Sequence, residues 1–232
     1  MNIFVLDKNP AIAAQMHCDK HVPKMIVEHA QMLATAYYHT IGISRKKEFK
    51  GREDEIARLF SGFPRKKEDG SDHPYSVTHV NHPCTIWTRT SIENFDWTLQ
   101  CTEALCDEFF NRWKNKQHSV RWIIEWMKQN PPTLLSSEQT PFATAMPICY
   151  MSEDAVQSYR KYYAFKTSYM KVVWKKLNNK PTWFTDEFVA ESLASYMPNP
   201  VPEKKPRKKN HHKSNMAIIQ QEFRHDPIII KI

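Results

Sequence analysis

The sequence predicts an all-α, compact single-domain fold with a basic C-terminal tail. Four glycines among 232 residues leave little material for β-hairpin turns, and most apolar residues recur at helical spacing. The 41% hydrophobic and 12% aromatic content supplies one sizeable core. We therefore expect a helical domain over residues 1–197, a basic Pro/Lys-rich tail or linker over 198–215, and an apolar segment over 216–232.

The first forty residues predict an arm followed by two helices. MNIFVLD alternates apolar residues, which indicates a short strand or an extended arm packed into the core. Asn9 as cap and Pro10 at the first helical position predict a short helix over about 10–20. Pro23 then either ends that helix or lies in the first turn of the next. The second helix has an apolar stripe at i, i+4 spacing, consisting of Val22, Ile26, Ala30, Leu33 and Tyr37.

The rest of the chain predicts one long helix and several short ones. Residues 42–80 are charged and rich in glycine, so we expect a surface loop or insertion with one helical island at EDEIARLF. An apolar face that persists from Pro83 to Trp113 predicts a single central helix. Shorter helices are expected before Pro131, after Ser152 and over 185–197, with SYMKVVWKKL able to extend the second of these.

Charge and cysteine content bear on partners and compartment. The formal charge is +8, and residues 198–215 hold six Lys/Arg against one Glu, which is +5 of that total. Such a tail suits a polyanion, nucleic acid first, with localisation or solubility as alternatives. No apolar run approaches the roughly 18–20 residues of a membrane span, so we expect no membrane partner. Five cysteines without a CxxC pair or secretory signal favour a reducing, cytoplasmic location.

The stretch HCDKHVPK, residues 17–24, is the first candidate site. His17 and His21 stand at i, i+4 and share a helix face, a spacing that can hold one metal ion. The stretch has no HExxH glutamate and two histidines are too few, so we expect neither metal nor cofactor. Histidines flanked by lysines can instead move protons or hold phosphates near neutral pH. The alternative is a set of solvated residues at a helix junction.

Two further stretches combine polar and aromatic residues. In HVNHPCTIWTR, Asn81 or His82 can cap the helix that Pro83 begins, with Arg89 exposed one turn beyond the buried Trp87. YRKYYAFKTSYMKVVWKK interleaves aromatic residues with cations, as a nucleic-acid face requires. A core helix with a basic outer side would give the same pattern.

The ordered set of motifs C-x-K-x-x-P-K at residue 18, N-H-P-x-x-x-W at residue 81 and KPTWF at residue 180 resembles the pyrimidine-dimer DNA glycosylase family of the phage endonuclease V type. The resemblance covers residues 1–184 in element order, apart from the 42–72 insertion. It implies an all-α fold whose N-terminus lies in the core near DNA. It also implies an enzyme that displaces a base from the duplex and cleaves the glycosidic bond with its N-terminal amine through a Schiff base, aided by a glutamate.

The resemblance also implies site residues. His21 falls where the family has its catalytic carboxylate, so we expect it to act as general acid/base, with His17 or His82 assisting and Met1 carrying the amine. Lys20 and Lys24 fall where the family has basic DNA contacts. The full set of expected nucleic-acid contacts is Lys20, Lys24, Asn81, Arg89, Arg160, Lys161, Lys166, Lys171 and Lys175 in the body, with Lys204, Lys205, Arg207, Lys208 and Lys209 in the tail.

The sequence thus predicts a phage-type enzyme, in the cytoplasm of an infected bacterial host, that acts on a base or its glycosidic bond in duplex DNA. Two alternatives keep the DNA partner. One is a non-catalytic DNA-binding phage regulator or anti-host factor. The other is a transferase that modifies thymine-type bases of phage DNA and takes a small-molecule donor as its second partner.

Overall fold

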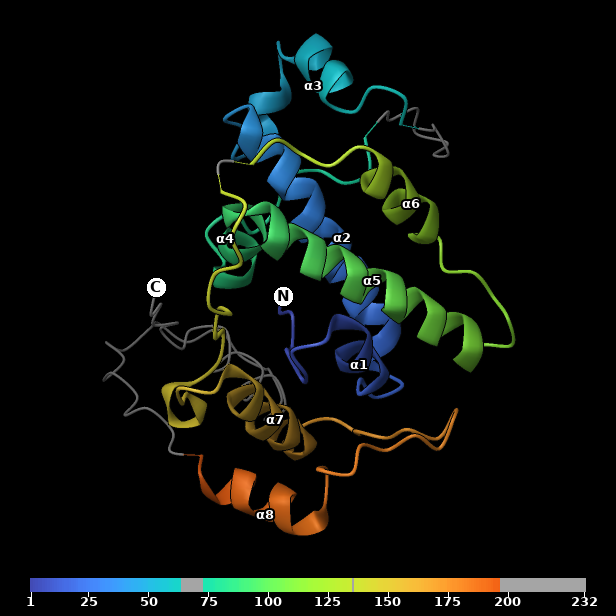
Figure 1. The fold of residues 1–232 in the computed structure, drawn as a ribbon, viewed down its shortest axis with the longest axis vertical. Helices are drawn as coiled ribbons and strands as arrows, with labels where there is room; N and C mark the ends of the chain where they lie inside the picture. Colours follow the sequence, from blue (N-terminus) through green and yellow to red (C-terminus); the bar gives the residue numbers. More distant parts are fainter. Residues whose placement is uncertain (64–72, 135, 197–232) are drawn as a thin grey trace, which may run out of the picture.

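The computed structural model describes residues 1–63, 73–134 and 136–196. Within those ranges the chain folds into α-helices and short 3₁₀ helices joined by loops, and they hold no strand (Figure 1). The all-α prediction is confirmed. The expectations for residues 198–215 and 216–232, and for the middle of the 42–80 insertion, fall outside the described residues.

The first helix is capped as predicted but ends early. The Asn9 side chain accepts hydrogen bonds from the backbone of Ala11 and Ile12, and α1 runs over Pro10–Gln15. We expected it to reach about residue 20. It stops because the carbonyl groups of Gln15 and His17 accept hydrogen bonds from the Arg112 side chain instead of from a further helical turn.

The second helix, α2, runs over His21–Thr40, so Pro23 lies in its first turn, where a missing N–H is harmless. Every residue of the predicted stripe is buried, from Val22 to Tyr37. α2 packs chiefly against α5, and the two helices cross at the centre of the molecule (Figure 1). This pair organises the core.

The predicted single helix from Pro83 to Trp113 is wrong in one respect, because it is two helices. α4 covers Pro83–Thr90 and α5 covers Ile92–Arg112. Between them Ser91 has an extended backbone, and its hydroxyl accepts a hydrogen bond from the backbone of Asn94. A serine that caps a helix competes with helix continuation, which the apolar periodicity alone does not reveal.

The remaining helices are short. The insertion holds a 3₁₀ turn over Lys46–Phe49 and α3 over Glu53–Leu59, as the helical island predicted. The others are α6 over Arg121–Gln129, 3₁₀ turns over Ile148–Tyr150 and Lys166–Ser168, α7 over Ala155–Phe165 and α8 over Asp186–Ala194.

The segment that was expected to extend α7 is not helical. The backbone N–H groups of Lys175 and Lys176 instead donate to the Asp19 carboxylate, at 2.8 and 3.2 Å. Asp19 in turn donates its own N–H to the Val173 carbonyl at 2.9 Å. These bonds hold the segment in an open conformation against the α1–α2 turn.

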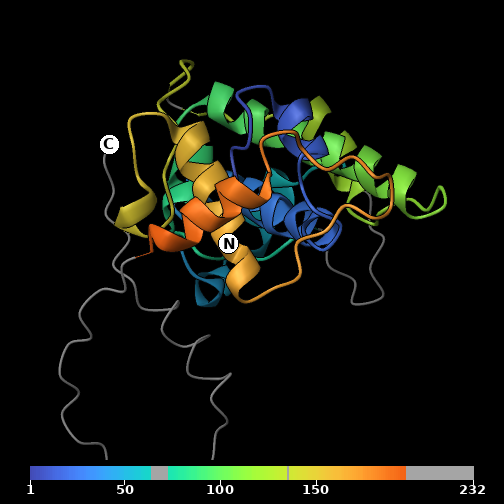
Figure 2. The same ribbon diagram turned by 90° about the horizontal axis from the view of Figure 1, so that it is seen from below.

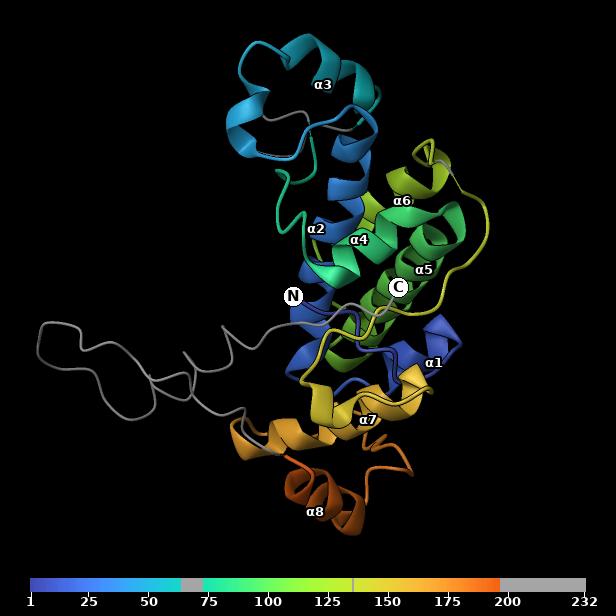
Figure 3. The ribbon, with the colours of Figure 1, turned by 90° about the vertical axis from the view of Figure 1, so that its left-hand side faces the viewer.

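Helices α7 and α8 form a layer that covers the lower end of the molecule (Figure 2). The N-terminal arm, residues 1–6, lies between α4 above and α7 below (Figures 1 and 3). Ile3, Phe4, Val5 and Leu6 of the arm are all buried. The arm is therefore part of the core, as the sequence suggested. None of the described helices combines the length and apolar character that crossing a bilayer requires.

Candidate functional site

The terminal amine of Met1 lies beside a carboxylate of α2. Its nitrogen is 3.6 Å from Oε2 of Glu28, and the Asn2 N–H donates to the same oxygen at 3.1 Å. Glu28 also lies 3.5 Å from the Lys24 ammonium through its other oxygen. The Glu28 side chain is 17% exposed, so this carboxylate is partly shielded from water between two cations.

Asn2 fixes the position of that amine. Its side-chain amide donates to the Ala145 carbonyl at 2.8 Å, and its oxygen accepts from the backbone of Ile3 and Phe4 at 2.8 and 3.1 Å. Asn2 is buried, so these bonds are shielded from competing water. Residue 2 is therefore anchored in the core and residue 1 is held next to Glu28.

Sequence reasoning missed Glu28. A signal for it was present, because Glu28 is the only carboxylate in α2. It stands four residues after Lys24 and seven after His21, so all three share one face of the helix. The family resemblance instead placed the catalytic group at His21, two turns earlier on the same face.

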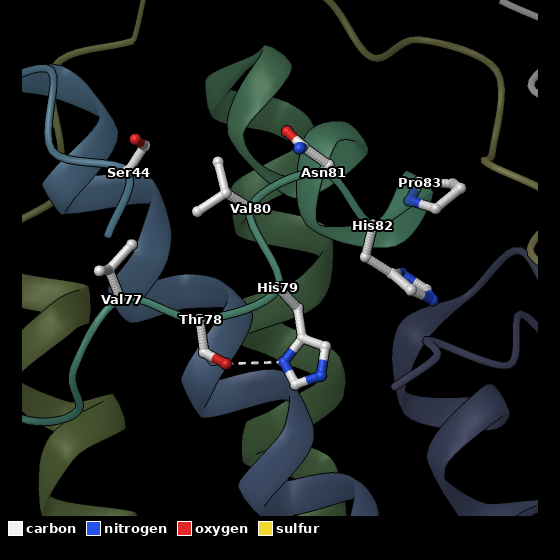
Figure 4. Close-up of a pocket in the computed structure, with 8 residues that line it drawn as sticks. All are labelled: Ser44, Val77, Thr78, His79, Val80, Asn81, His82 and Pro83. Atoms are coloured by element: carbon white, nitrogen blue, oxygen red, sulfur yellow. Dashed lines mark hydrogen bonds between the residues drawn. The ribbon is translucent and has the colours of Figure 1, made fainter. Parts of the chain in front are cut away.

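A cleft of about 650 Å³ is lined by Ser44 and residues 77–83 (Figure 4). Asn81 and His79 extend to opposite sides of this loop (Figure 4). His79 has a left-handed backbone, with φ of 48°, and its ring pairs with the Thr78 hydroxyl at 2.7 Å. Strained backbone of this kind concentrates at functional sites.

His82 lines the cleft, and its pKa responds to the charge of the terminal amine. Its Nδ1 accepts from the Cys84 N–H, which caps α4 as predicted. Burial, and next to it the charge of the terminal amine, lower the pKa of His82 to about 4. His82 is therefore neutral near pH 7 and lies close to the amine without adding to the positive charge.

The structure corrects the placement of His21. Its ring stacks on Phe4, with centroids 5.2 Å apart, and its Nδ1 pairs with the Tyr163 hydroxyl at 2.8 Å. It is 2% exposed, and burial, then the nearby Lys166, lowers its pKa to about 2. A neutral core histidine of this kind cannot serve a substrate as the expected acid or base, because a proton-transfer group must reach the reacting atoms.

His17 is likewise a core residue. Its Nδ1 pairs with the Ala13 carbonyl at 2.8 Å, and burial lowers its pKa to about 4. Its ring centroid lies 6.4 Å from that of His21. In the part of the chain that the structure describes, no three His, Cys, Asp or Glu residues are grouped so that they could hold a metal.

The expected nucleic-acid contacts divide into two groups. Lys20, Lys24, Asn81, Lys171 and Lys175 are exposed and could meet phosphates. Lys24 also pairs with Glu28, and the remaining contacts expected in the described residues are engaged within the protein.

Each member of this second group has a partner. Arg89 donates to the Val80 carbonyl, and Lys161 pairs with Glu191 at 3.3 Å. Arg160 donates to the Leu6 carbonyl at 2.9 Å and lies over the Trp183 ring. Arg89 was expected to be exposed but is half-buried, because its side chain folds back and donates to the Val80 carbonyl of the 77–83 loop.

Lys166 differs most from expectation, because its side chain is buried. The five tail residues Lys204, Lys205, Arg207, Lys208 and Lys209 lie outside the described residues.

Comparisons of this chain with protein-family models, with curated proteins and with solved structures found no match.

Proposed function

We propose that the protein is a DNA-binding enzyme that attacks a nucleotide's sugar with the Met1 amine, assisted by Glu28, and so acts on the glycosidic bond of a displaced base. The observation that carries the proposal is the 3.6 Å distance between the Met1 nitrogen and Glu28 Oε2. The proposal keeps the reaction class that the sequence predicted and transfers the carboxylate's role from His21 to Glu28.

The reaction needs a neutral amine and a group that takes its proton. Glu28 can accept that proton, after which the amine attacks the C1′ carbon of the sugar. A bond from nitrogen to C1′ forms while the bond from C1′ to the base breaks, and the base leaves with the electron pair and takes up a proton. Opening of the sugar ring then gives an imine. The Glu28 carboxylate stabilises the positive charge that develops during these steps.

The surroundings of the amine support a DNA substrate. The cleft along residues 77–83 is large enough for a base displaced from a duplex. Asn81 is exposed and lines this cleft, and Lys24 is an exposed cation in the first turn of α2. An asparagine amide and a lysine ammonium can both donate hydrogen bonds to the phosphates that flank a displaced nucleotide.

Borohydride trapping tests the proposal. Duplex DNA with an abasic site or a thymine dimer is expected to give a covalent adduct at residue 1, located by peptide mapping and checked against the intact mass of the N-terminus. Glu28→Gln keeps the size of the side chain but loses the proton acceptor, and is expected to slow trapping about 100-fold.

Glu191→Gln is the matched control, because Glu191 is an exposed carboxylate paired with Lys161, and it is expected to trap at the wild-type rate. Absence of any adduct at residue 1 on folded, DNA-bound protein would overturn the proposal. In that case a non-catalytic DNA-binding regulator, or a base-modifying enzyme, would explain the DNA binding better.

The basic tail has its own expected effect. Deleting residues 198–232 is expected to weaken DNA binding and to flatten its salt dependence, because each neutralised phosphate contributes about −0.9 to the log–log slope. The eight Lys/Arg of residues 198–232 set the upper limit of the change at about seven units of slope. Fluorescence anisotropy over a series of salt concentrations measures it, and an unchanged slope would exclude the tail as a phosphate contact.

A further inference from the structure

Lys166 follows α7 in the 3₁₀ turn Lys166–Ser168, and its amine is enclosed by aromatic rings. Its Nζ lies 4.4 Å from the ring centre of Tyr162, 4.8 Å from that of Phe4 and 5.4 Å from that of Tyr169. It donates a hydrogen bond to the Tyr169 hydroxyl at 2.7 Å. The whole residue is 8% exposed, and no other lysine among the described residues is buried.

The charge of this amine has no carboxylate partner at ion-pair distance within the described residues. Burial, and then the nearby Lys24 ammonium, lower the pKa of Lys166 to about 7. Glu28 and Cys18 act in the opposite direction, and the facing His21 is neutral. A large fraction of Lys166 is therefore an uncharged amine at neutral pH, unlike an exposed lysine, whose pKa is about 10.4.

We propose that Lys166 is a second nucleophilic amine of this protein and forms a Schiff base with an aldehyde. The neutral nitrogen attacks the carbonyl carbon, the carbon–oxygen double bond opens, and the resulting carbinolamine loses water to give a protonated imine. No oxidant or reductant is needed. The proposal stands apart from the proposed function, since it uses neither the Met1 amine nor the glycosidic bond.

The route to the amine passes Tyr169. Tyr169 is 41% exposed and its hydroxyl is the hydrogen-bond partner of Nζ, so Tyr169 is the partly exposed residue among those that enclose the amine. The proposal requires this ring to change rotamer for a small carbonyl compound to reach Nζ. An aldehyde can come from a free small molecule or from the opened sugar of an abasic site, and the chemistry is the same.

Reductive labelling of the full-length protein tests the proposal. Glyoxylate with cyanoborohydride near pH 7 is expected to label Lys166 at least 10-fold faster than Lys171, an exposed lysine five residues further along, as measured by peptide mapping over time. The labelling rate of Lys166 should reach half its maximum near pH 7, whereas that of Lys171 should still be rising above pH 9. Lys166 labelled no faster than Lys171 would overturn the proposal.

Two variants and a second probe test whether the fast labelling occurs at Lys166 itself. Lys166→Met fits the aromatic surroundings and Lys166→Arg keeps the cation, and both are expected to lose the fast-labelled site while Lys171 is labelled as before. An abasic duplex with borohydride is the second probe, and an adduct at Lys166 would identify the DNA sugar as the aldehyde source. Adducts at Met1 and at Lys166 lie in different peptides, so failure of one proposal is distinguishable from failure of the other.

Discussion

Lowering the pH from about 7.5 to about 5 is expected to remove about 6 kcal/mol from the free energy of unfolding. Three fully buried histidines account for this figure, and the partly buried His82, whose pKa is lowered to about 4, changes stability in the same direction. Burial is the largest influence on each, and it lowers the pKa of His17 to about 4, of His21 to about 2 and of His29 to about 3. In the unfolded chain each would titrate near pH 6.5.

The direction follows from proton binding. Below about pH 6.5 the unfolded chain takes up a proton on each histidine and the folded protein does not, so falling pH favours unfolding. Each histidine contributes about 2 kcal/mol at about pH 5, since one pH unit corresponds to about 1.36 kcal/mol. A loss of this size is comparable to the whole stability of many domains, about 5–15 kcal/mol. Urea unfolding at the two pH values measures it.

His29→Leu identifies the source. Leucine is of similar size and cannot bind a proton, so this variant is expected to lose about 2 kcal/mol less than the wild type on the same pH change. His79→Asn is the control, because His79 is exposed, and it should leave the pH dependence unchanged. If His29→Leu lost as much stability as the wild type, the buried histidines would not be the cause.

Replacing Arg112 by methionine is expected to cost about 3–5 kcal/mol of stability. The Arg112 side chain is fully buried in α5. Its nitrogens donate to Glu108 at 2.6 and 2.8 Å and to Asp19 at 3.2 Å. They also donate to the carbonyl groups of His17 and Gln15.

Methionine fills the space but leaves the buried Glu108 and the partly buried Asp19 without this cation and the His17 carbonyl without a donor. Thermal or denaturant unfolding measures the effect. Arg121→Gln is the matched control: Arg121 pairs with Asp107 at 2.6 Å, but Asp107 is 59% exposed, so a loss of about 1 kcal/mol or less is expected. Equal losses for the two variants would contradict the proposed role of Arg112.

Arg112 also explains why the HCDKHVPK stretch could be recognised but not interpreted from sequence. Its chemistry-bearing residues look catalytic, yet His17 contributes its carbonyl and Asp19 its carboxylate to the Arg112 cluster. Arg112 stands on α5, remote in sequence, and no local pattern links it to this turn. Caps and apolar stripes were predictable because they depend on residues a few positions apart, whereas this cluster depends on tertiary contacts.

The same reason explains why the sequence indicated neither the role of Glu28 nor the burial of Lys166. Lys166 belongs to a run of lysines in the sequence, and its contact with Phe4 of the arm depends on the tertiary fold. Glu28 became a candidate because the arm brings Met1 to it. The break at Ser91 was missed for the opposite reason, since a local cap overrides a periodicity that continues on both sides.

The buried arm also constrains the order in which the protein folds during synthesis. The Asn2 side chain binds the Ala145 carbonyl, 143 residues away, and the Leu6 carbonyl binds Arg160, 154 residues away. Residues 1–6 leave the ribosome long before these partners do, by about 7 to 30 s at a synthesis rate of about 5–20 residues per second. Closing such distant contacts is slow. The arm, and with it the Met1 amine, can therefore reach its final position only after α7 has been made. The surroundings of both candidate amines thus form at the last stage of folding.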